Sequence, residues 1–161
     1  MATPRTGSNL LHLSLSTHSN ARWAGEAFNP KFGAPDTEHY NLFKVFPHPE
    51  VESFLGLPNT LRVYLWRQDT EAQLRSWKKA CKTGKWLADQ EGLLEPAAFS
   101  YKDALNQIRW ADSNFLKAAH YTVSYERLVS HWNDTLRNIL ILASWPYEFI
   151  NQAIKKQSTI N

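Results

Sequence analysis

LRVYLW, at residues 61–66, is the strongest strand pattern in the chain, because it is dense in residues that favour extended structure. Asp69 is a good N-cap, and the apolar spacing after it predicts a helix from about residue 69 to residue 85. A strand that leads into a long helix is the repeating unit of folds with a parallel sheet. The buried stripe of this helix is expected to contain Leu74, Trp77, Cys81 and Gly84.

The same alternation of strands and helices continues on both sides of this unit. Residues 1–3 are expected to be the end of a strand, and a turn at residues 4–8 leads into a predicted helix over residues 9–17. Further strands are predicted at residues 22–28, 42–46 and 121–125, and further helices at residues 50–55, 100–120 and 132–145, with a loop at residues 29–41. We therefore expect one α/β domain over residues 1–161, with a parallel sheet flanked by helices.

Composition limits the class of protein. The chain has 161 residues, of which 43% are hydrophobic, and this is enough for one domain with a buried core. Cys81 is the only cysteine, so an intramolecular disulfide and a cysteine-based zinc site are excluded. No apolar run approaches the roughly 20 residues that span a bilayer, and the N-terminus lacks the apolar region of a signal peptide. We therefore expect a cytoplasmic protein.

An anion-binding turn is predicted by the segment TPRTGSNL at residues 3–10. The backbone N–H groups and the dipole at the N-terminus of a helix attract anions. Arg5 adds a planar, charged donor that suits phosphate and sulfate, and Ser8 adds a hydroxyl. The same residues are also consistent with an ordinary turn between a strand and a helix that contains one glycine and binds no anion. The residues expected to hold the anion are Arg5, Thr6, Gly7, Ser8 and Asn9.

A nucleotide-hydrolysing enzyme is not favoured. The chain contains no G-x-x-x-x-G-K-[ST] segment, so the lysine and the Mg²⁺-binding hydroxyl of that phosphate loop are missing. The same absence argues against a small-molecule kinase. The net charge of +3 fits an anionic ligand, and it fits a nucleic-acid-binding protein equally well.

The turn at residues 3–10 resembles the 5′-phosphosulfate loop of sulfotransferases that use 3′-phosphoadenosine-5′-phosphosulfate (PAPS). The bacterial carbohydrate branch, which includes lipopolysaccharide, glycolipid and nodulation-factor sulfotransferases, commonly reads P-R-[ST]-G-S there. Arg67, at the end of the predicted strand, and Ser76, in the helix that follows, are similar to the family's 3′-phosphate site. Alternatively, Arg67 pairs with a surface carboxylate and Ser76 has no role in binding.

Other segments resemble the same family in the same order along the chain. The segments are GEAFNP at residues 25–30, FKV at 43–45, KTGKW at 82–86, VSYERL at 123–128 and KKQS at 155–158. Arg127 stands where the family usually has Asp. Family members are usually longer, and the Gly-rich basic loop of the cytosolic branch is absent.

The resemblance implies a P-loop-like three-layer fold and a function. PAPS would be the sulfuryl donor, 3′-phosphoadenosine-5′-phosphate the product, a small-molecule or glycan hydroxyl the acceptor, and no metal would be needed. Lys155 and Lys156 would join the cofactor-binding residues. Glu26 would be the general base, with His12 as the alternative base, and Lys44 and Arg5 would neutralise charge on the transferred group.

A non-catalytic nucleotide- or nucleic-acid-binding module of the same fold remains the alternative function, although we expect no nucleic-acid partner. Its binding surface would be a basic face on the helix at residues 69–85. Such a face is usually only solvated, and it also suits an anionic membrane surface. Its members are Arg75, Lys78, Lys79, Lys82 and Lys85.

Overall fold

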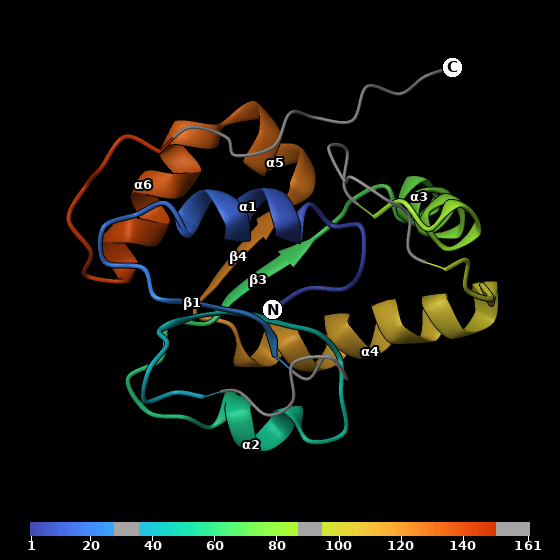
Figure 1. Cartoon of the computed structure of the whole chain (residues 1–161), viewed down its shortest axis with the longest axis horizontal. Helices are drawn as coiled ribbons and strands as arrows, with labels where there is room; N and C mark the ends of the chain where they lie inside the picture. Colours follow the sequence, from blue (N-terminus) through green and yellow to red (C-terminus); the bar gives the residue numbers. More distant parts are fainter. Residues whose placement is uncertain (28–35, 87–94, 151–161) are drawn as a thin grey trace.

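The structure is a computed structural model that describes residues 1–27, 36–86 and 95–150 (Figure 1). Within these ranges it has an α/β fold with six helices and four short strands. In chain order the elements are α1 (Ser8–Leu15), β1 (Trp23–Ala27), β2 (Leu42–Val45), α2 (Val51–Leu55), β3 (Val63–Trp66), α3 (Thr70–Thr83), α4 (Tyr101–Ala118), β4 (Tyr121–Ser124), α5 (Tyr125–Ser130) and α6 (Trp132–Leu142).

All the strand pairs are parallel, as expected, but they form two separate sheets. β1 pairs with β2, and β3 pairs with β4. The N-terminal segment lies between the two pairs, because the N–H of Ala2 donates to the carbonyl of Val45 at 3.0 Å and the N–H of Leu65 donates to the carbonyl of Met1 at 3.0 Å. This segment contributes only an isolated bridge, since Pro4 follows it and has no N–H to continue a ladder. The described residues therefore do not form the single central sheet that we expected.

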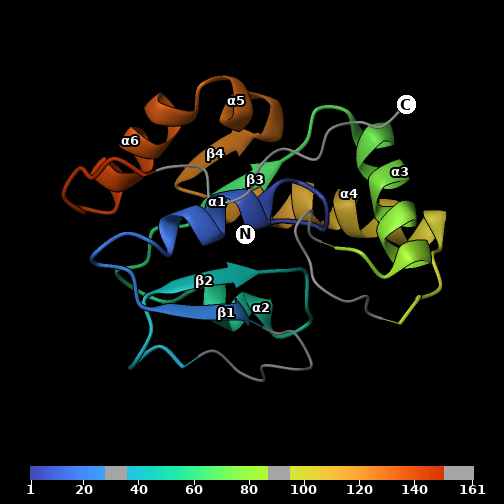
Figure 2. The same cartoon turned by 45° about the horizontal axis from the view of Figure 1, so that its top comes forward.

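Helices pack on both faces of β3. Successive side chains of a strand point to opposite faces, so neighbouring residues join different clusters. Leu65 lies in a buried cluster with residues of α1, β4, α5 and α6, whereas Tyr64 lies in a cluster with residues of β2, α2 and α4. Figure 2 shows β1 and β2 beside α2, with α5 and α6 on the far side of β3 and β4. A third cluster joins α3 to α4.

The predicted helix starts agree with the observed caps. The Asp69 side chain accepts from the N–H of Ala72 at 2.8 Å, and the Ser100 hydroxyl accepts from the N–H of Asp103 at 3.3 Å. The predicted strand at residues 121–125 ends one residue earlier, because the Ser124 hydroxyl accepts from the N–H of Arg127 and so caps α5. No described helix combines the length and the apolar composition needed to cross a membrane.

Candidate functional site

Two of the predicted site segments meet where parallel strands end. Arg5 follows the N-terminal segment, and Arg67 follows β3. Figure 1 shows that the arrowheads of β3 and β4 point toward the end of α1 at which that helix begins. The carboxyl ends of parallel strands are the usual place for ligands in such folds.

Gly7 shapes the turn before α1. It is the N-cap residue of that helix, and its φ of 82° lies in the left-handed region that favours glycine. A Cβ at this position would lie 2.5 Å from Cδ2 of Tyr125 and 2.9 Å from Cε2 of the same ring. The turn therefore needs glycine both for its backbone angle and for the close approach of Tyr125.

A polar network ties this turn to α3. The Gln73 amide donates to the hydroxyl of Thr3 and to the carbonyl of Pro4, each at 2.8 Å. The Thr6 hydroxyl donates to the carbonyl of Thr3 at 2.9 Å. Thr6 is fully buried, so its hydroxyl stabilises the turn and is not accessible to a ligand. Gln73 was not predicted to be a site residue.

Two guanidinium groups lie beside this turn. Nε of Arg5 donates to the hydroxyl of Ser76 at 2.9 Å, and Nη1 of Arg5 donates to the carbonyl of Trp86. Nη1 of Arg67 donates to the carbonyl of Arg5 at 3.4 Å. Burial, and then the charge of Arg67, lower the pKa of Arg5. The structure thus brings together three predicted ligand-binding residues, and two of them are positively charged.

Residues that follow β4 complete this group. The guanidinium of Arg67 lies over the Tyr125 ring, 4.9 Å from its centre, and its Nε lies 3.8 Å from a carboxylate oxygen of Glu126. Nε of Arg67 is buried and has no hydrogen-bond partner, because 3.8 Å is too long for such a bond. The alternative prediction, that Arg67 pairs with a carboxylate, is therefore supported only by this 3.8 Å contact with Glu126. Sequence reasoning assigned no role to Tyr125 or Glu126, although both lie in the segment at residues 123–128 that resembles the family.

A second polar group lies on β1 and β2. Glu26 and Lys44 are direct partners in the register of these strands, and their side chains form an ion pair. Lys44 also donates to the side-chain oxygen of Asn9 in α1. Lys44 is only 5% exposed, and burial lowers its pKa whereas the charge of Glu26 opposes that shift. The predicted base and the predicted charge-neutralising lysine are thus in contact.

His12, the alternative base, lies one turn into α1. Its Nδ1 accepts a hydrogen bond from the indole N–H of Trp23 at 3.1 Å. The side chain is 6% exposed, and burial, followed by the charge of Lys44, lowers its pKa from 6.5 to about 4. The ring is therefore neutral at pH 7. Because Nδ1 is the acceptor, Nε2 carries the proton.

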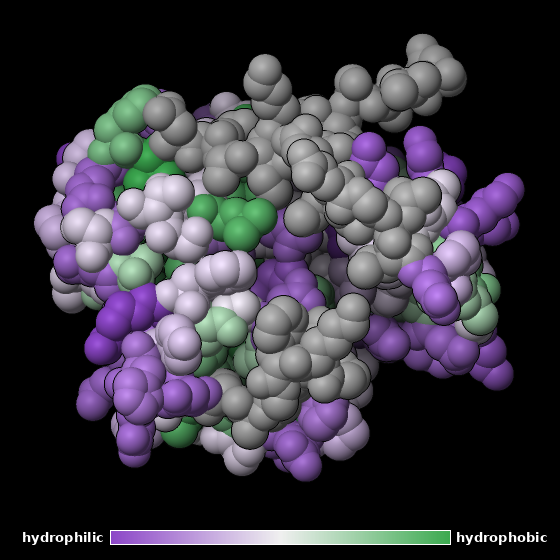
Figure 3. Space-filling view, viewed as in Figure 1, coloured by the Kyte–Doolittle hydropathy of each residue, from purple (hydrophilic) through white to green (hydrophobic). Residues whose placement is uncertain are grey.

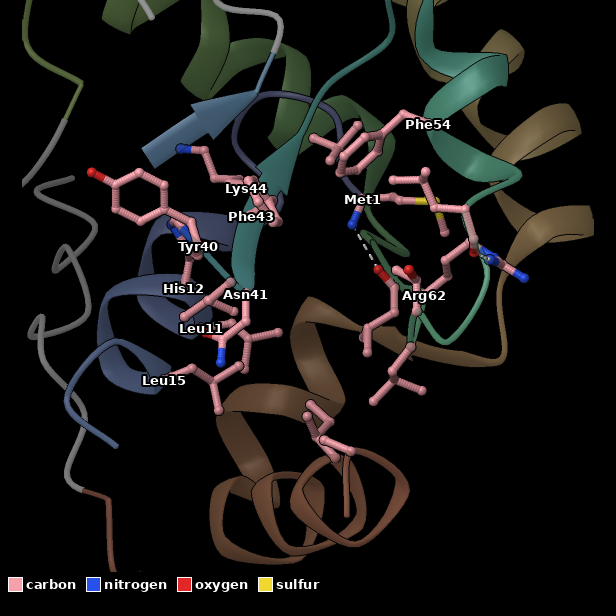
Figure 4. A pocket seen from close by; sticks show the side chains of 18 of the residues that line it. Met1, Leu11, His12, Leu15, Tyr40, Asn41, Phe43, Lys44, Phe54 and Arg62 are labelled. Atoms are coloured by element: carbon pink, nitrogen blue, oxygen red, sulfur yellow. Dashed lines mark hydrogen bonds between the residues drawn. The ribbon is translucent and has the colours of Figure 1, made fainter. Parts of the chain in front are cut away.

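A cleft of about 560 Å³ lies outside the arginine group (Figure 4). Ser8, His12 and Lys44 are among the residues that line it, but Arg5, Arg67 and Ser76 are not. The cleft and the two guanidinium groups are therefore separate features of the surface.

The other predicted residues are placed as follows. Ser8 is the first residue of α1. The five basic residues predicted to share a helical face are all exposed, but α3 ends at Thr83, so Lys85 lies beyond the helix. Hydrophilic side chains gather over α3 in Figure 3. Lys155 and Lys156 lie outside the described residues, as do residues 28–30 of the GEAFNP segment. Within the described ranges, no cluster of three or more His, Cys, Asp or Glu side chains could hold a metal ion.

Comparison with known proteins adds no relative from which a function could be carried over. Neither protein-family models, nor curated proteins, nor solved structures match this chain. The resemblance to sulfotransferases stays a prediction, and the function must be argued from the two polar groups.

Proposed function

We propose that this chain is a PAPS-dependent sulfotransferase that transfers a sulfuryl group to a hydroxyl of a carbohydrate or glycolipid acceptor. The observation that carries the proposal is the meeting of Arg5, Arg67 and Ser76 beside the glycine turn that begins α1. The positive charge of Arg67 acts unfavourably on the Arg5 guanidinium, and a bound dianion would offset that repulsion. A donor with two phosphate-type groups provides such a dianion.

The two ends of the donor would bind to different parts of this region. Arg67 and Ser76 suit the 3′-phosphate, since Nε of Arg67 is a buried donor without a hydrogen-bond partner. The backbone at the start of α1 suits the 5′-phosphosulfate, because Gly7 leaves that end of the helix without a side-chain cap. Arg5 is bonded to Ser76, so its guanidinium lies on the 3′-phosphate side of the turn. Positive charge from arginine would replace a metal ion.

The geometry favours Glu26 over His12 as the general base. His12 is neutral, its Nδ1 already accepts a hydrogen bond from Trp23, and its low pKa makes it a poor proton acceptor. In the transfer, the acceptor oxygen forms a bond to sulfur while the bond from sulfur to the leaving phosphate oxygen breaks. The hydroxyl proton passes to the Glu26 carboxylate, and the Lys44 ammonium beside it stabilises charge on the sulfuryl oxygens.

The proposed fold is P-loop-like, with both small sheets acting as one layer. Its support is the N-terminal segment, which is hydrogen-bonded to Val45 of β2 on one side and to Leu65 of β3 on the other. This gives the spatial order β1, β2, residues 1–3, β3, β4. The cytoplasmic location and the contact of α3 with an anionic membrane stay predictions.

The test is a calorimetric titration with 3′-phosphoadenosine-5′-phosphate, with and without a chelator, followed by transfer from radiolabelled PAPS to a panel of glycans and glycolipids. We expect binding that the chelator does not change, and transfer to at least one acceptor. Binding of ATP only in the presence of Mg²⁺ would contradict the proposal. Preferential binding of single-stranded nucleic acid would favour the non-catalytic module, whose surface would be the basic face of α3.

A further inference from the structure

The segments that follow β3 and β4 carry opposite charges at the same end of this sheet. Trp66 and Ser124, the last residues of the two strands, are partners in the parallel register. Arg67 follows β3 directly, and Glu126 is the second residue after β4. The register therefore brings a guanidinium and a carboxylate together in the region proposed to hold the 3′-phosphate.

The Glu126 carboxylate is bonded to the backbone rather than to the arginine. Its Oε2 accepts a hydrogen bond from the N–H of Gln68 at 3.1 Å. Its Oε1 lies 3.8 Å from Nε of Arg67, which is too far for a hydrogen bond. That Nε is buried and has no hydrogen-bond partner among the described residues. Glu126 thus offsets part of the charge of Arg67 but leaves its Nε–H without an acceptor.

A phosphate that bonded to this Nε would lie close to the carboxylate. Its oxygen would be about 2.7–2.9 Å from Nε. The carboxylate oxygen is 3.8 Å from the same atom, so the two negative oxygens would be at most about 7 Å apart. This is less than the distance of about 8 Å over which physiological salt screens a charge. Glu126 therefore repels a phosphate that binds to Arg67, or must move away from it.

We propose that Glu126 competes with the 3′-phosphate for Arg67 and thereby weakens the binding of 3′-phosphoadenosine-5′-phosphate. This inference rests on the proposed function, because it assigns a regulatory role within the same donor site. In the empty site the carboxylate offsets the charge of Arg67. In the occupied site it repels the phosphate, so the product leaves faster than the two arginines alone would allow. Product release is often the slow step of an enzyme, so faster release favours turnover.

A purely structural role for Glu126 predicts a change in the opposite direction. If the carboxylate only positioned Arg67, its loss would displace the guanidinium and weaken phosphate binding. Glu126→Gln keeps a side-chain oxygen that can accept from the N–H of Gln68, and it removes only the charge. The direction of the change in affinity therefore separates competition from positioning.

The test is a calorimetric titration of the whole chain with 3′-phosphoadenosine-5′-phosphate and with adenosine 5′-phosphate. We expect Glu126→Gln to bind the bisphosphate about tenfold more tightly than the wild type does, and adenosine 5′-phosphate with unchanged affinity. Glu52→Gln is the matched control, because Glu52 is exposed in α2, which packs in the Tyr64 cluster on the opposite face of β3 from α5. It should change the affinity for neither nucleotide.

Release of the product gives a second measurement. Dissociation of 3′-phosphoadenosine-5′-phosphate, followed by stopped-flow displacement, should be slower in Glu126→Gln and should account for most of the gain in affinity. Glu126→Ala also removes the charge and should change the affinity in the same direction. Thermal unfolding verifies that each variant is folded.

The outcomes distinguish this inference from the proposed function. If the wild type binds the bisphosphate and Glu126→Gln binds it equally or more weakly, Glu126 does not compete for Arg67, whereas the donor site stands. An equal gain for both nucleotides would likewise overturn the competition at the 3′-phosphate. If the bisphosphate binds to neither chain, both the donor site and the role of Glu126 are wrong.

Discussion

Nε of Arg5 donates a 2.9 Å hydrogen bond to the hydroxyl of Ser76, although 71 positions separate the two residues in the chain. Gln73, one turn earlier in α3, donates to the backbone of the same N-terminal segment. α3 is therefore hydrogen-bonded at two points to the segment that precedes α1. The proposed donor site lies between these two elements, so we expect a substitution on α3 to change the conformation of the turn.

Arg67→Ala should weaken 3′-phosphoadenosine-5′-phosphate far more than adenosine 5′-phosphate, which lacks the 3′-phosphate. A charge-assisted hydrogen bond contributes about 1.5–3 kcal/mol, so we expect a loss of about 10- to 150-fold in affinity for the bisphosphate, measured by calorimetry. Arg75→Ala, which removes an exposed arginine of α3, is the matched control and should have little effect. Equal losses for both nucleotides would show that the end of β3 does not hold the 3′-phosphate.

Gly7→Ala should destabilise the protein by about 2–4 kcal/mol. The new Cβ would meet the Tyr125 ring at 2.5 Å, and the φ of 82° strains any residue with a side chain. Gly56→Ala is the matched control, because Gly56 has a φ of −81° and its nearest contact would be an ordinary 3.6 Å. Urea unfolding should place Gly56→Ala within about 1 kcal/mol of the wild type. Similar free energies of unfolding for the two variants would contradict the packing of Tyr125 on the turn.

These contacts show what the sequence can and cannot predict. The caps of α3 and α4 were predicted because a cap is formed by residues three positions apart. The helix α5 was missed because Tyr121 to Tyr125 alternate like a strand, and only the Ser124 cap separates strand from helix. The meeting of Arg5 with Ser76 was not predicted, because it depends on how α3 packs against the N-terminal segment. The pairing of Glu26 with Lys44 likewise requires the register of two strands, which neither strand specifies alone.

Because the pKa of His12 is lowered in the folded state, we expect the free energy of unfolding to decrease as the pH falls. The folded pKa of about 4 lies below the ordinary value of 6.5, so between these two values the unfolded chain binds a proton that the folded chain excludes. The contribution of the neutral ring is complete above pH 6.5 and is lost progressively toward pH 4, amounting to about 3 kcal/mol. Urea unfolding at several pH values measures this slope.

His12→Phe should remove most of this pH dependence. His131→Gln is its control, because His131 is exposed, its ring is hydrogen-bonded to the neutral hydroxyl of Ser130, and its loss should leave the slope unchanged. A slope that is the same in the wild type and in His12→Phe would mean that other groups cause the acid sensitivity.

Glu26→Gln should destabilise the protein by leaving the charge of Lys44 buried without a partner. Breaking a buried ion pair from one side costs about 3–5 kcal/mol, and replacing both members recovers much of that loss. The Glu26→Gln/Lys44→Met double variant should therefore unfold at a higher urea concentration than Glu26→Gln alone. If the double variant is the less stable of the two, the pair does not form in solution.

The same variants separate the structural role of Glu26 from its proposed chemical role. Glu26→Gln should reduce sulfuryl transfer by about 10²–10⁴-fold, because an amide cannot accept the hydroxyl proton. Binding of 3′-phosphoadenosine-5′-phosphate should stay nearly unchanged, since Glu26 contacts neither Arg67 nor Ser76 in the interactions described above. Turnover of Glu26→Gln is measured at a temperature at which its thermal unfolding curve shows the variant to be folded, so lost turnover cannot be a consequence of unfolding. His12→Asn should retain most of the transfer, because the neutral imidazole is a poor proton acceptor. If His12→Asn abolishes transfer and Glu26→Gln leaves it intact, the base is His12, and Glu26 serves only to hold Lys44 in place.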